Sequence, residues 1–350
     1  MNLGVPTVSV VMPVFNERPY LTRAVQSVLD QSFQDFELIV VNDGSTDGSK
    51  DVMEHFADTD GRIRIVHQEN QGVSVALNRA LELSRGRYIA RMDGDDVTHP
   101  ERFGRQVHFL DSNPQTGVLG TKSEYIDTDG DPHRWGRWPI PTEPTIIAWR
   151  LLFNTSVTHP SVMMRHDLVD ELGGYAEWAF PAEDYELWTR AVRKTRLANL
   201  PATLHRLRRH EESVTVSRRA DQIQKCTEAA LALHREILGP SVRKEIVQFL
   251  VWMETIGFED AIDRAGALDL GAVHTYMRNL YEAHRHRLAV EGPSVRARQN
   301  ALAQLDIVAD KLAERNGWGP GALRRVSARL MAPSAEILPW MWRAFRERLD

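Results

Sequence analysis

Short apolar segments and amphipathic segments alternate through the first half of the chain, and this alternation constrains the fold more than any other feature. Val8–Met12 is a β-branched run that ends at Pro13, and Pro19–Leu29 repeats apolar residues at helical spacing. Strands that alternate with helices through short turns predict parallel strands joined by right-handed crossovers. Further strands are predicted at Phe36–Val41, Arg62–His67 and Arg87–Met92, with intervening helices that end at Phe56 and span Val73–Ser84.

The pattern becomes less regular after this alternation. Gly, Pro, Asp and Trp are frequent in Asp127–Pro144, which is the composition of a long loop. A long loop beside a binding site is often a lid or a substrate-recognition element, and we expect that role for it. Around it we predict helices at Pro100–Asn113 and Ala182–Arg193 and strands at Gly117–Thr121, Ser161–Met164 and Leu204–Arg209.

The last part of the chain is helical in composition, with breaks at Gly and Pro residues. We place a domain boundary near Arg218, between an α/β domain over residues 1–217 and an all-helical region over residues 218–350. Gln222–Leu238 and Val295–Ala313 carry apolar stripes. Such stripes predict helices that pack on the α/β domain or on each other.

The composition excludes several classes of protein. A chain of 350 residues with 42% hydrophobic and 26% charged residues is typical of globular proteins. Its net charge of −5 gives no broad basic footprint for nucleic acid. Cys226 is the single cysteine, so no internal disulfide forms, which fits a reducing compartment. With no signal peptide and no run of about 20 apolar residues, we expect a cytoplasmic protein, soluble or at most attached to the inner face of the cell membrane.

Polar side chains follow the predicted strands at the points where the strands end. They are Asn16–Glu17, Asn42–Asp43 and Asp93–Asp96. In open α/β sheets, ligands bind at this carboxyl edge, so a ligand site is expected there.

The most informative of these clusters holds three carboxylates within four residues: Asp93, Asp95 and Asp96. Carboxylates this close repel one another unless a positive group lies among them. A hard divalent cation, Mg²⁺ or Mn²⁺, is the natural partner, and its remaining coordination positions would accept substrate phosphates. A solvated acidic turn is the alternative.

The segment Asn42–Asp47 combines a tight turn at Gly44 with residues that suit the start of a helix. Asp43 would then accept a hydrogen bond from a ligand such as a nucleobase imide. A turn and helix cap without a ligand is the alternative.

Two later charged motifs have both a structural and a chemical interpretation. Glu183–Asp184 at a helix start would interact with the helix dipole, or would remove a proton from an attacking hydroxyl. Arg208–Ser213 would neutralise a diphosphate leaving group, or would form a solvated charged loop.

Taken together, these motifs resemble the family 2 glycosyltransferases of GT-A fold, a Rossmann-like, mostly parallel sheet flanked by helices. The resemblance covers roughly residues 7–215. Each motif is weak alone, but the ordered set at the family's separations is specific. The residues that carry it are Val10–Glu17, Asn42–Asp47, Asn70–Gly72, Asp93–Asp96 and Glu183–Asp184, followed by Leu187, Trp188 and Arg190.

The resemblance implies a role for each matching residue. Asp95 would hold Mn²⁺ or Mg²⁺, with Asp93 and His210 as further ligands. Asp184 would be the general base, with Glu183 beside it. The residues implied at the donor site are Pro13, Phe15, Glu17, Asp43, Gly72, Asp93, Asp96, Arg208 and His210.

Three positions call for comment. Asn42 stands where many relatives carry a second Asp. Leu77 stands where a basic residue is frequent, so one donor contact is absent or supplied elsewhere. His159 belongs to a segment that resembles the one before the family's acceptor-side strand, and simple packing is an equal alternative for it.

The activity implied is inverting transfer of a sugar from a nucleotide-diphosphate donor, with a UDP-sugar favoured, to an acceptor hydroxyl. The acceptor would be a carbohydrate or a lipid-linked saccharide, as in surface polysaccharide synthesis. A non-catalytic nucleotide-sugar-binding or scaffold protein on a degenerate domain is the alternative, and the intact acidic residues count against it. A nucleotidyltransferase is disfavoured because Val14–Glu17, after the first strand, has no glycine to hold a triphosphate.

The last segment, Ile337–Arg346, combines aromatic residues with arginines. It would suit an anionic membrane surface near a lipid-linked acceptor. It would equally suit docking on a partner subunit, as in a homo-oligomer. Both interpretations stay open at this point.

Overall fold

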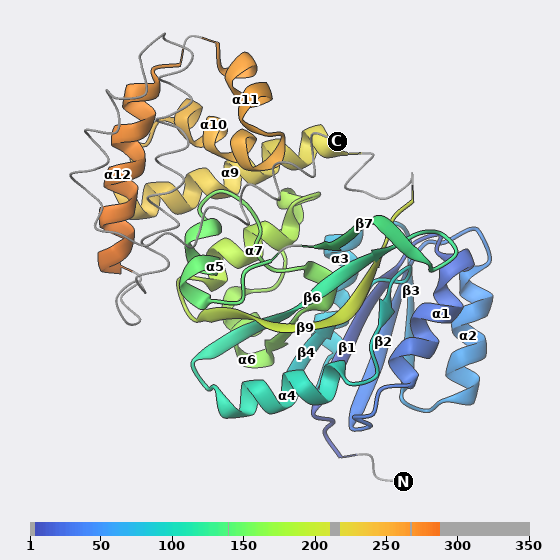
Figure 1. Cartoon of the computed structure of the whole chain (residues 1–350). Coiled ribbons are helices and arrows are strands. Elements are labelled where there is room, and N and C mark those ends of the chain that lie inside the picture. Colours follow the sequence, from blue (N-terminus) through green and yellow to red (C-terminus); the bar gives the residue numbers. More distant parts are fainter. Residues whose placement is uncertain (1–3, 139, 211–217, 267, 288–350) are drawn as a thin grey trace.

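The computed structural model describes residues 4–138, 140–210, 218–266 and 268–287. A twisted sheet lies between helices, and a group of helices from the end of the described chain packs beside it (Figure 1). The chain therefore has the α/β architecture expected from its alternating segments, followed by the expected helical region.

The sheet has nine strands in the order β3-β2-β1-β4-β8-β6-β9-β5, with β7 paired to β6 outside this path. β1 pairs in parallel with both β2 and β4, and β2 pairs in parallel with β3. β8 is antiparallel to both its neighbours, β4 and β6. The strands are β1 Val8–Val14, β2 Phe36–Asp43, β3 Ile63–Gln68, β4 Tyr88–Arg91, β5 Val97–Thr98, β6 Thr116–Ile126, β7 Pro132–Trp138, β8 Met163–Arg165 and β9 Arg196–Arg208.

Helices cover the sheet on both faces. α1, α2 and α4 cover one face, and α3, α6 and α7 cover the other. The helices of this domain are α1 Arg18–Leu29, α2 Ser49–Thr59, α3 Val73–Leu83, α4 Arg102–Ser112, α5 Pro144–Arg150, α6 His166–Leu172 and α7 Glu183–Ala191, with short 3₁₀ turns η1 His159–Ser161 and η2 Glu177–Ala179.

The central strands read as unbroken apolar runs because both of their faces are buried. Val10 and Val40 belong to the core under α1, whereas Val11 and Val41 belong to the core under α3 and α7. Successive side chains of a strand point to opposite faces, so both must be apolar when helices cover both. This explains why the strands of the first half could be predicted from sequence.

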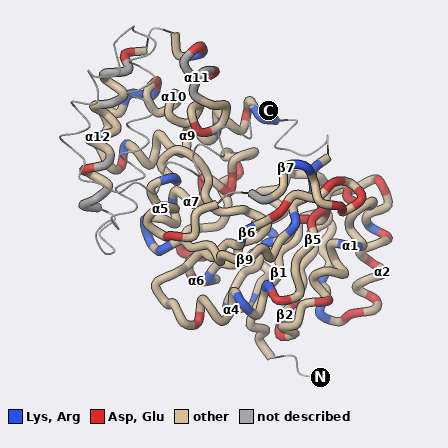
Figure 2. The backbone as a smooth tube through the Cα atoms, in the orientation of Figure 1, with Lys and Arg blue, Asp and Glu red and all other residues tan. Residues whose placement is uncertain are grey.

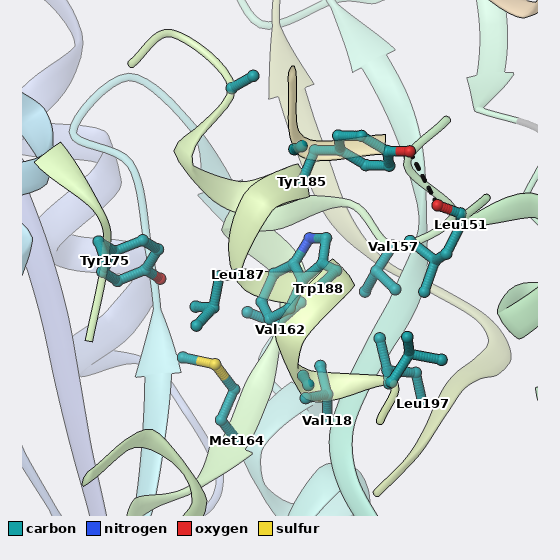
Figure 3. Close-up of a cluster of buried hydrophobic side chains, with 14 of the residues drawn as sticks. Val118, Leu151, Val157, Val162, Met164, Tyr175, Tyr185, Leu187, Trp188 and Leu197 are labelled. Carbon is teal, nitrogen blue, oxygen red and sulfur yellow. Dashed lines mark hydrogen bonds between the residues drawn. The ribbon is translucent and has the colours of Figure 1, made fainter. Parts of the chain in front are cut away.

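Helix α7 is anchored by a buried cluster of side chains (Figure 3). Trp188 and Leu187 are fully buried and pack with Val118, Val162 and Met164 from β6 and the β8 region. Tyr185 donates a hydrogen bond of 2.8 Å to the carbonyl oxygen of Leu151. These contacts fix the first turn of α7, which carries Glu183 and Asp184.

The expectation of a long loop over Asp127–Pro144 is wrong. Pro132–Trp138 forms β7, which pairs antiparallel with β6 to make a hairpin. Gly136 has a φ of +64°, a conformation that glycine adopts without strain, and its presence made the segment look irregular.

The strand predicted at Leu204–Arg209 is longer in the structure, where it begins at Arg196, because its preceding residues pair in parallel with β6. Helices α5 and α6 were not predicted.

The helical region contains α9 Arg219–Leu238, α10 Lys244–Thr255, α11 Phe258–Ala265 and α12 Leu270–Arg287. A third core joins it to the α/β domain, where Trp149 and Phe153 pack with Leu233 and Phe249. The expected packing of Gln222–Leu238 on the α/β domain is thus confirmed.

Val295–Ala313 and Ile337–Arg346 lie outside the described residues. None of the helices that the structure describes has the length and apolar character required to cross a bilayer.

Candidate active site

The acidic and basic residues singled out from sequence converge at the carboxyl edge of the central strands. Glu17 follows β1, Asp43 ends β2, and Asp93–Asp96 connects β4 to β5. Acidic segments gather around β5 and the adjoining loops (Figure 2). The end of β9 reaches the same place, since His205 and Thr98 are paired across β5 and β9.

The turn after β4 fits closely against the start of α1. A Cβ atom at Gly94 would lie 3.3 Å from Val14 Cγ2 and 3.4 Å from Glu17 Cγ, so a larger residue would require these side chains to shift slightly. Glycine between the aspartates therefore lets the turn pack against Val14 and Glu17 without displacing either side chain.

Four carboxyl groups crowd this site and disfavour one another's ionised forms. Burial, followed by the charges of Asp95 and Asp93, raises the pKa of Glu17 from 4.5 to about 9. Burial and the charge of Asp93 raise the pKa of Asp96 to about 8. Such a set of groups calls for a cation.

Two of the aspartates already have protein partners. Asp96 is 2% exposed, accepts a hydrogen bond of 2.8 Å from the backbone N–H of Arg208, and lies 2.8 Å from His205 Nε2. Asp93 forms an ion pair with Arg91. Both side chains are therefore held in place from within the protein.

Glu17, Asp95 and His210 form the group best suited to a metal ion. Their ligand atoms lie within 4.8 Å of one another, and His210 Nε2 is 3.1 Å from Asp95 Oδ2. Asp93, Asp95 and Asp96 form a second such group, but two of its members have the partners described above. Two carboxylates and one imidazole suit Mn²⁺ or Mg²⁺, so these residues fit the ion that the sequence implies.

Arg208 is committed to the backbone of the site. Its Nε donates to the carbonyl oxygen of Asp95 at 2.7 Å, and its Nη1 donates to the carbonyl oxygens of Asp127 at 2.5 Å and Thr128 at 2.9 Å. The guanidinium lies 4.6 Å from the centre of the Tyr20 ring, which in turn lies 5.5 Å from the His210 ring. Arg208 thus joins the acidic turn to the β6–β7 hairpin.

Asp43 holds a neighbouring loop. Its carboxylate accepts hydrogen bonds from the backbone N–H groups of Gln71 and Gly72, each at 2.9 Å, and from Gln68 Nε2 at 2.8 Å. Only 3% of Asp43 is exposed. This explains why Asp43 and Gly72 belong to one site, while the contact of Asp43 with a nucleobase stays a prediction.

The residues expected around the nucleoside differ in exposure. Phe15 is 48% exposed at the rim, whereas Pro13 is buried within β1. Asn16, with a φ of +57°, accepts a hydrogen bond from the N–H of Thr46 and donates its own N–H to Ser45 Oγ. The loops after β1 and β2 are therefore joined into one surface.

Glu183 and Asp184 occupy the first turn of α7. Burial, followed by the charge of Asp184, raises the pKa of Glu183 to about 7, and burial raises that of Asp184. Among the described residues, Glu183 Oε2 is buried without a hydrogen-bond partner. A carboxyl group with a pKa near neutrality is suited to accept a proton in a reaction.

Three residues of the site were missed from sequence. Arg91 and His205 are charged or polar residues within strands, and Tyr175 lies in the turn after α6.

His159 Nε2 lies 2.9 Å from Tyr175 Oη, and burial holds the pKa of His159 well below its usual range. His159 is thus a packed, neutral imidazole. Leu77 is fully buried in the core, so this position makes no contact with a donor.

Comparison with known proteins agrees with this geometry. The sequence model described as Glycosyl transferase family 2 matches residues 9–173. The O-antigen biosynthesis glycosyltransferase WbnJ of Escherichia coli is 31% identical over 60% of this chain and 82% of its own length. An uncharacterized glycosyltransferase of Haemophilus influenzae is 31% identical over 59% of this chain, and the match spans 66% of that protein, just under two thirds.

A solved structure shares the fold. S. aureus TarS 1-349, in complex with UDP-GlcNAc, superposes with a TM-score of 0.55 and covers 89% of this chain and 92% of its own. The sequence identity is 19%, so this likeness concerns the fold. The expected GT-A fold, a sheet flanked by helices, is confirmed, and the sheet is mixed: β1 to β4 pair in parallel, whereas β8 is antiparallel to both its neighbours.

Proposed function

Because the chain belongs to the family 2 glycosyltransferases, we propose that it transfers a sugar from a UDP-sugar to an acceptor hydroxyl with inversion at the anomeric carbon. The observation that carries the proposal is the convergence of two acidic sites. Glu17, Asp95 and His210 form a group suited to a metal; Arg91 acts on Asp95 and Asp93 acts on Glu17, and the charges of both also act on the Glu183–Asp184 pair. A donor diphosphate and an acceptor hydroxyl would therefore meet between them.

The donor diphosphate would bind at the group of Glu17, Asp95 and His210. These residues would hold Mn²⁺ or Mg²⁺, and a bound divalent ion supplies positive charge for the oxygens of the departing diphosphate. Asp93, held by Arg91, and Asp96, held by His205 and Arg208, would line the adjoining part of the donor pocket.

Asp184 would act as the general base. The acceptor oxygen attacks the anomeric carbon, the bond from that carbon to the diphosphate oxygen breaks, and the hydroxyl proton passes to the Asp184 carboxylate. Glu183, with its pKa raised to about 7, would share the negative charge of the pair and orient Asp184. No covalent bond to the protein is needed.

The acceptor class follows from a relative. WbnJ is described as an O-antigen biosynthesis enzyme, and this supports a saccharide acceptor, free or lipid-linked, in surface polysaccharide synthesis. If the acceptor is lipid-linked, a cytoplasmic protein would reach it through peripheral contact at the membrane, and the aromatic and arginine residues of Ile337–Arg346 suit such contact. Liposome co-sedimentation with and without residues 334–350 tests that contact, and equal sedimentation would exclude it.

Isothermal titration with UDP, with and without Mn²⁺, tests the donor site. We expect binding that requires Mn²⁺ and is lost in Asp95→Ala, after which UDP-sugars can be screened for transfer. If UDP does not bind, GDP and dTDP are titrated next. Absence of binding to all three nucleotides would contradict the proposal and favour a degenerate, non-catalytic domain.

A further inference from the structure

Arg91 is a buried cation at the centre of the site, and the activity proposed above assigns it no role of its own beyond holding Asp93. It is the last residue of β4 and is 4% exposed. Its N–H donates to the carbonyl oxygen of Val162 at 3.0 Å, and its own carbonyl oxygen accepts from Arg102 Nη2 at 2.8 Å. Its backbone is thus fixed from both sides, which directs the side chain from a rigid strand.

The guanidinium of Arg91 has one ion-pair partner, and its Nε makes no hydrogen bond to the residues that the structure describes. It forms an ion pair with Asp93 through Nη1. Its Nε is buried, and no residue that the structure describes accepts a hydrogen bond from it. Burying a charged N–H group without an acceptor is unfavourable, so an oxygen from a bound molecule would complete the site.

The position of Arg91 indicates which part of the donor it meets. Its ion-pair partner Asp93 belongs to the turn that also carries Asp95. Its charge also acts on Tyr175, Glu183 and Asp184, and its backbone N–H bonds to Val162, which packs in the buried cluster that anchors α7. In a glycosyl transfer the sugar ring lies between the diphosphate and the acceptor hydroxyl. Arg91 and Asp93 therefore lie where the sugar ring would be.

A phosphate clamp is a poorer description of Arg91. Its charge is paired with the Asp93 carboxylate, and the metal-binding group of Glu17, Asp95 and His210 is the part of the site suited to the diphosphate. A guanidinium beside a carboxylate offers both donors and acceptors, which is the pattern that neighbouring sugar hydroxyls require.

We propose that Arg91 is a positioning residue for the donor sugar: it holds Asp93 toward the hydroxyls of the sugar ring and offers its Nε to one of them. This inference rests on the proposed function. It assigns the pair a part in sugar recognition that is separable from nucleotide and metal binding.

The test compares UDP with UDP-sugar binding by isothermal titration in the presence of Mn²⁺. The sugar probe is whichever of UDP-glucose, UDP-galactose and UDP-GlcNAc the wild type binds most tightly. In Arg91→Met we expect the Kd for UDP to stay within about twofold and the Kd for the UDP-sugar to rise about 10- to 100-fold, as for loss of charged hydrogen bonds. Arg91→Lys should give an intermediate rise.

Two further variants keep the test decisive. Arg91→Met with Asp93→Asn removes both charges together, so it leaves no uncompensated carboxylate, and the Kd for the UDP-sugar should rise at least as much as in Arg91→Met. Arg87→Met removes an exposed ion pair with Asp111 just before β4 and should change neither Kd.

The outcomes distinguish a failure of the role proposed for Arg91 from a failure of the proposed function. Equal losses of UDP and UDP-sugar affinity, together with a lower melting temperature in all Arg91 variants, would make Arg91 merely structural and overturn the positioning role. Unchanged UDP-sugar affinity would overturn it as well. If the wild type binds neither UDP nor any UDP-sugar, the donor class of the proposed function fails, and the role of Arg91 fails with it.

Discussion

His210 Nε2 lies 3.1 Å from Asp95 Oδ2, although the two residues are 115 positions apart in the chain. The contact exists because the turn after β4 and the end of β9 meet at the same edge of the sheet, where β5 pairs with β9. Glu17 completes the group from the loop after β1. Three separate connections of the fold therefore contribute to one group whose ligand atoms are suited to a metal ion.

Replacing His210 should weaken metal-dependent nucleotide binding without unfolding the domain. In His210→Ala the group loses its only imidazole, and we expect the affinity for UDP in Mn²⁺ to fall at least about tenfold. Isothermal titration at matched Mn²⁺ concentrations measures this. His55→Ala, an exposed histidine on α2, is the control and should bind as the wild type does. Equal affinity in His210→Ala would remove His210 from the group.

Much of the fold could be predicted because the central strands carry local signals. β1 and β2 are buried on both faces and so form continuous apolar runs. β7 has no such run, and it exists because it pairs with β6, which no local pattern reveals. The first part of β9 contains Pro201 and likewise depends on pairing with β6. Pairing between segments, rather than local preference, decides these elements.

The residues of the site, like the strands, were only partly predictable from sequence. The acidic residues could be found because they cluster in sequence at strand ends. His205 could not, because its role arises from contact with Asp96, 109 positions away. Arg208 was expected to approach the diphosphate, yet its guanidinium is directed to three backbone carbonyl oxygens. The sequence predicts which acidic and basic residues form the site, and the structure shows which side chains hold the others in place.

Replacing the proposed base should separate catalysis from binding. Asp184→Asn keeps the shape of the side chain but cannot accept the acceptor's proton, so we expect kcat to fall about 10²- to 10⁴-fold while UDP binding in Mn²⁺ is unchanged. Release of UDP in the presence of donor and acceptor measures the rate. Glu177→Gln, an exposed position in the preceding turn, should keep full activity. Near-normal turnover of Asp184→Asn would assign the base elsewhere.

The stability of the metal-free protein should fall as pH rises. The pKa of Glu17 is raised from 4.5 to about 9 and that of Asp96 from 3.8 to about 8. Because both values exceed those of the unfolded chain, the folded chain binds more protons across this interval and loses stability as the groups ionise. We therefore expect a lower melting temperature at pH 8 than at pH 5 in EDTA.

Metal should reverse this trend, because a cation favours the ionised carboxylates. Mn²⁺ should raise the melting temperature more at pH 8 than at pH 5, as measured by thermal denaturation. Glu17→Gln should be less sensitive to pH and should gain less from Mn²⁺. A melting temperature that rises with pH in EDTA, or an equal gain from Mn²⁺ at both pH values, would contradict the expectation.

Arg208 could act on the donor directly, by contacting the diphosphate, or indirectly, by holding Asp95, and a substitution distinguishes the two. Its guanidinium donates in two directions, to Asp95 on the acidic turn and to Asp127 and Thr128 on the β6–β7 hairpin. A lysine ammonium keeps the charge but cannot reproduce this planar arrangement of donors. We therefore expect Arg208→Lys to lose stability, by about 1–3 kcal/mol for unsatisfied buried groups, and to bind UDP more weakly.

The matched control for Arg208 is Arg206→Lys, an exposed position on the same strand that pairs with Glu124 and should change little. Thermal denaturation and titration with UDP and uridine distinguish the two modes of action. If Arg208 contacted the diphosphate directly, Arg208→Lys would retain much of its affinity for UDP, keep the melting temperature of the wild type, and bind uridine normally. If it acts by holding Asp95, melting temperature and metal-dependent UDP binding should fall together, because the same three hydrogen bonds support both.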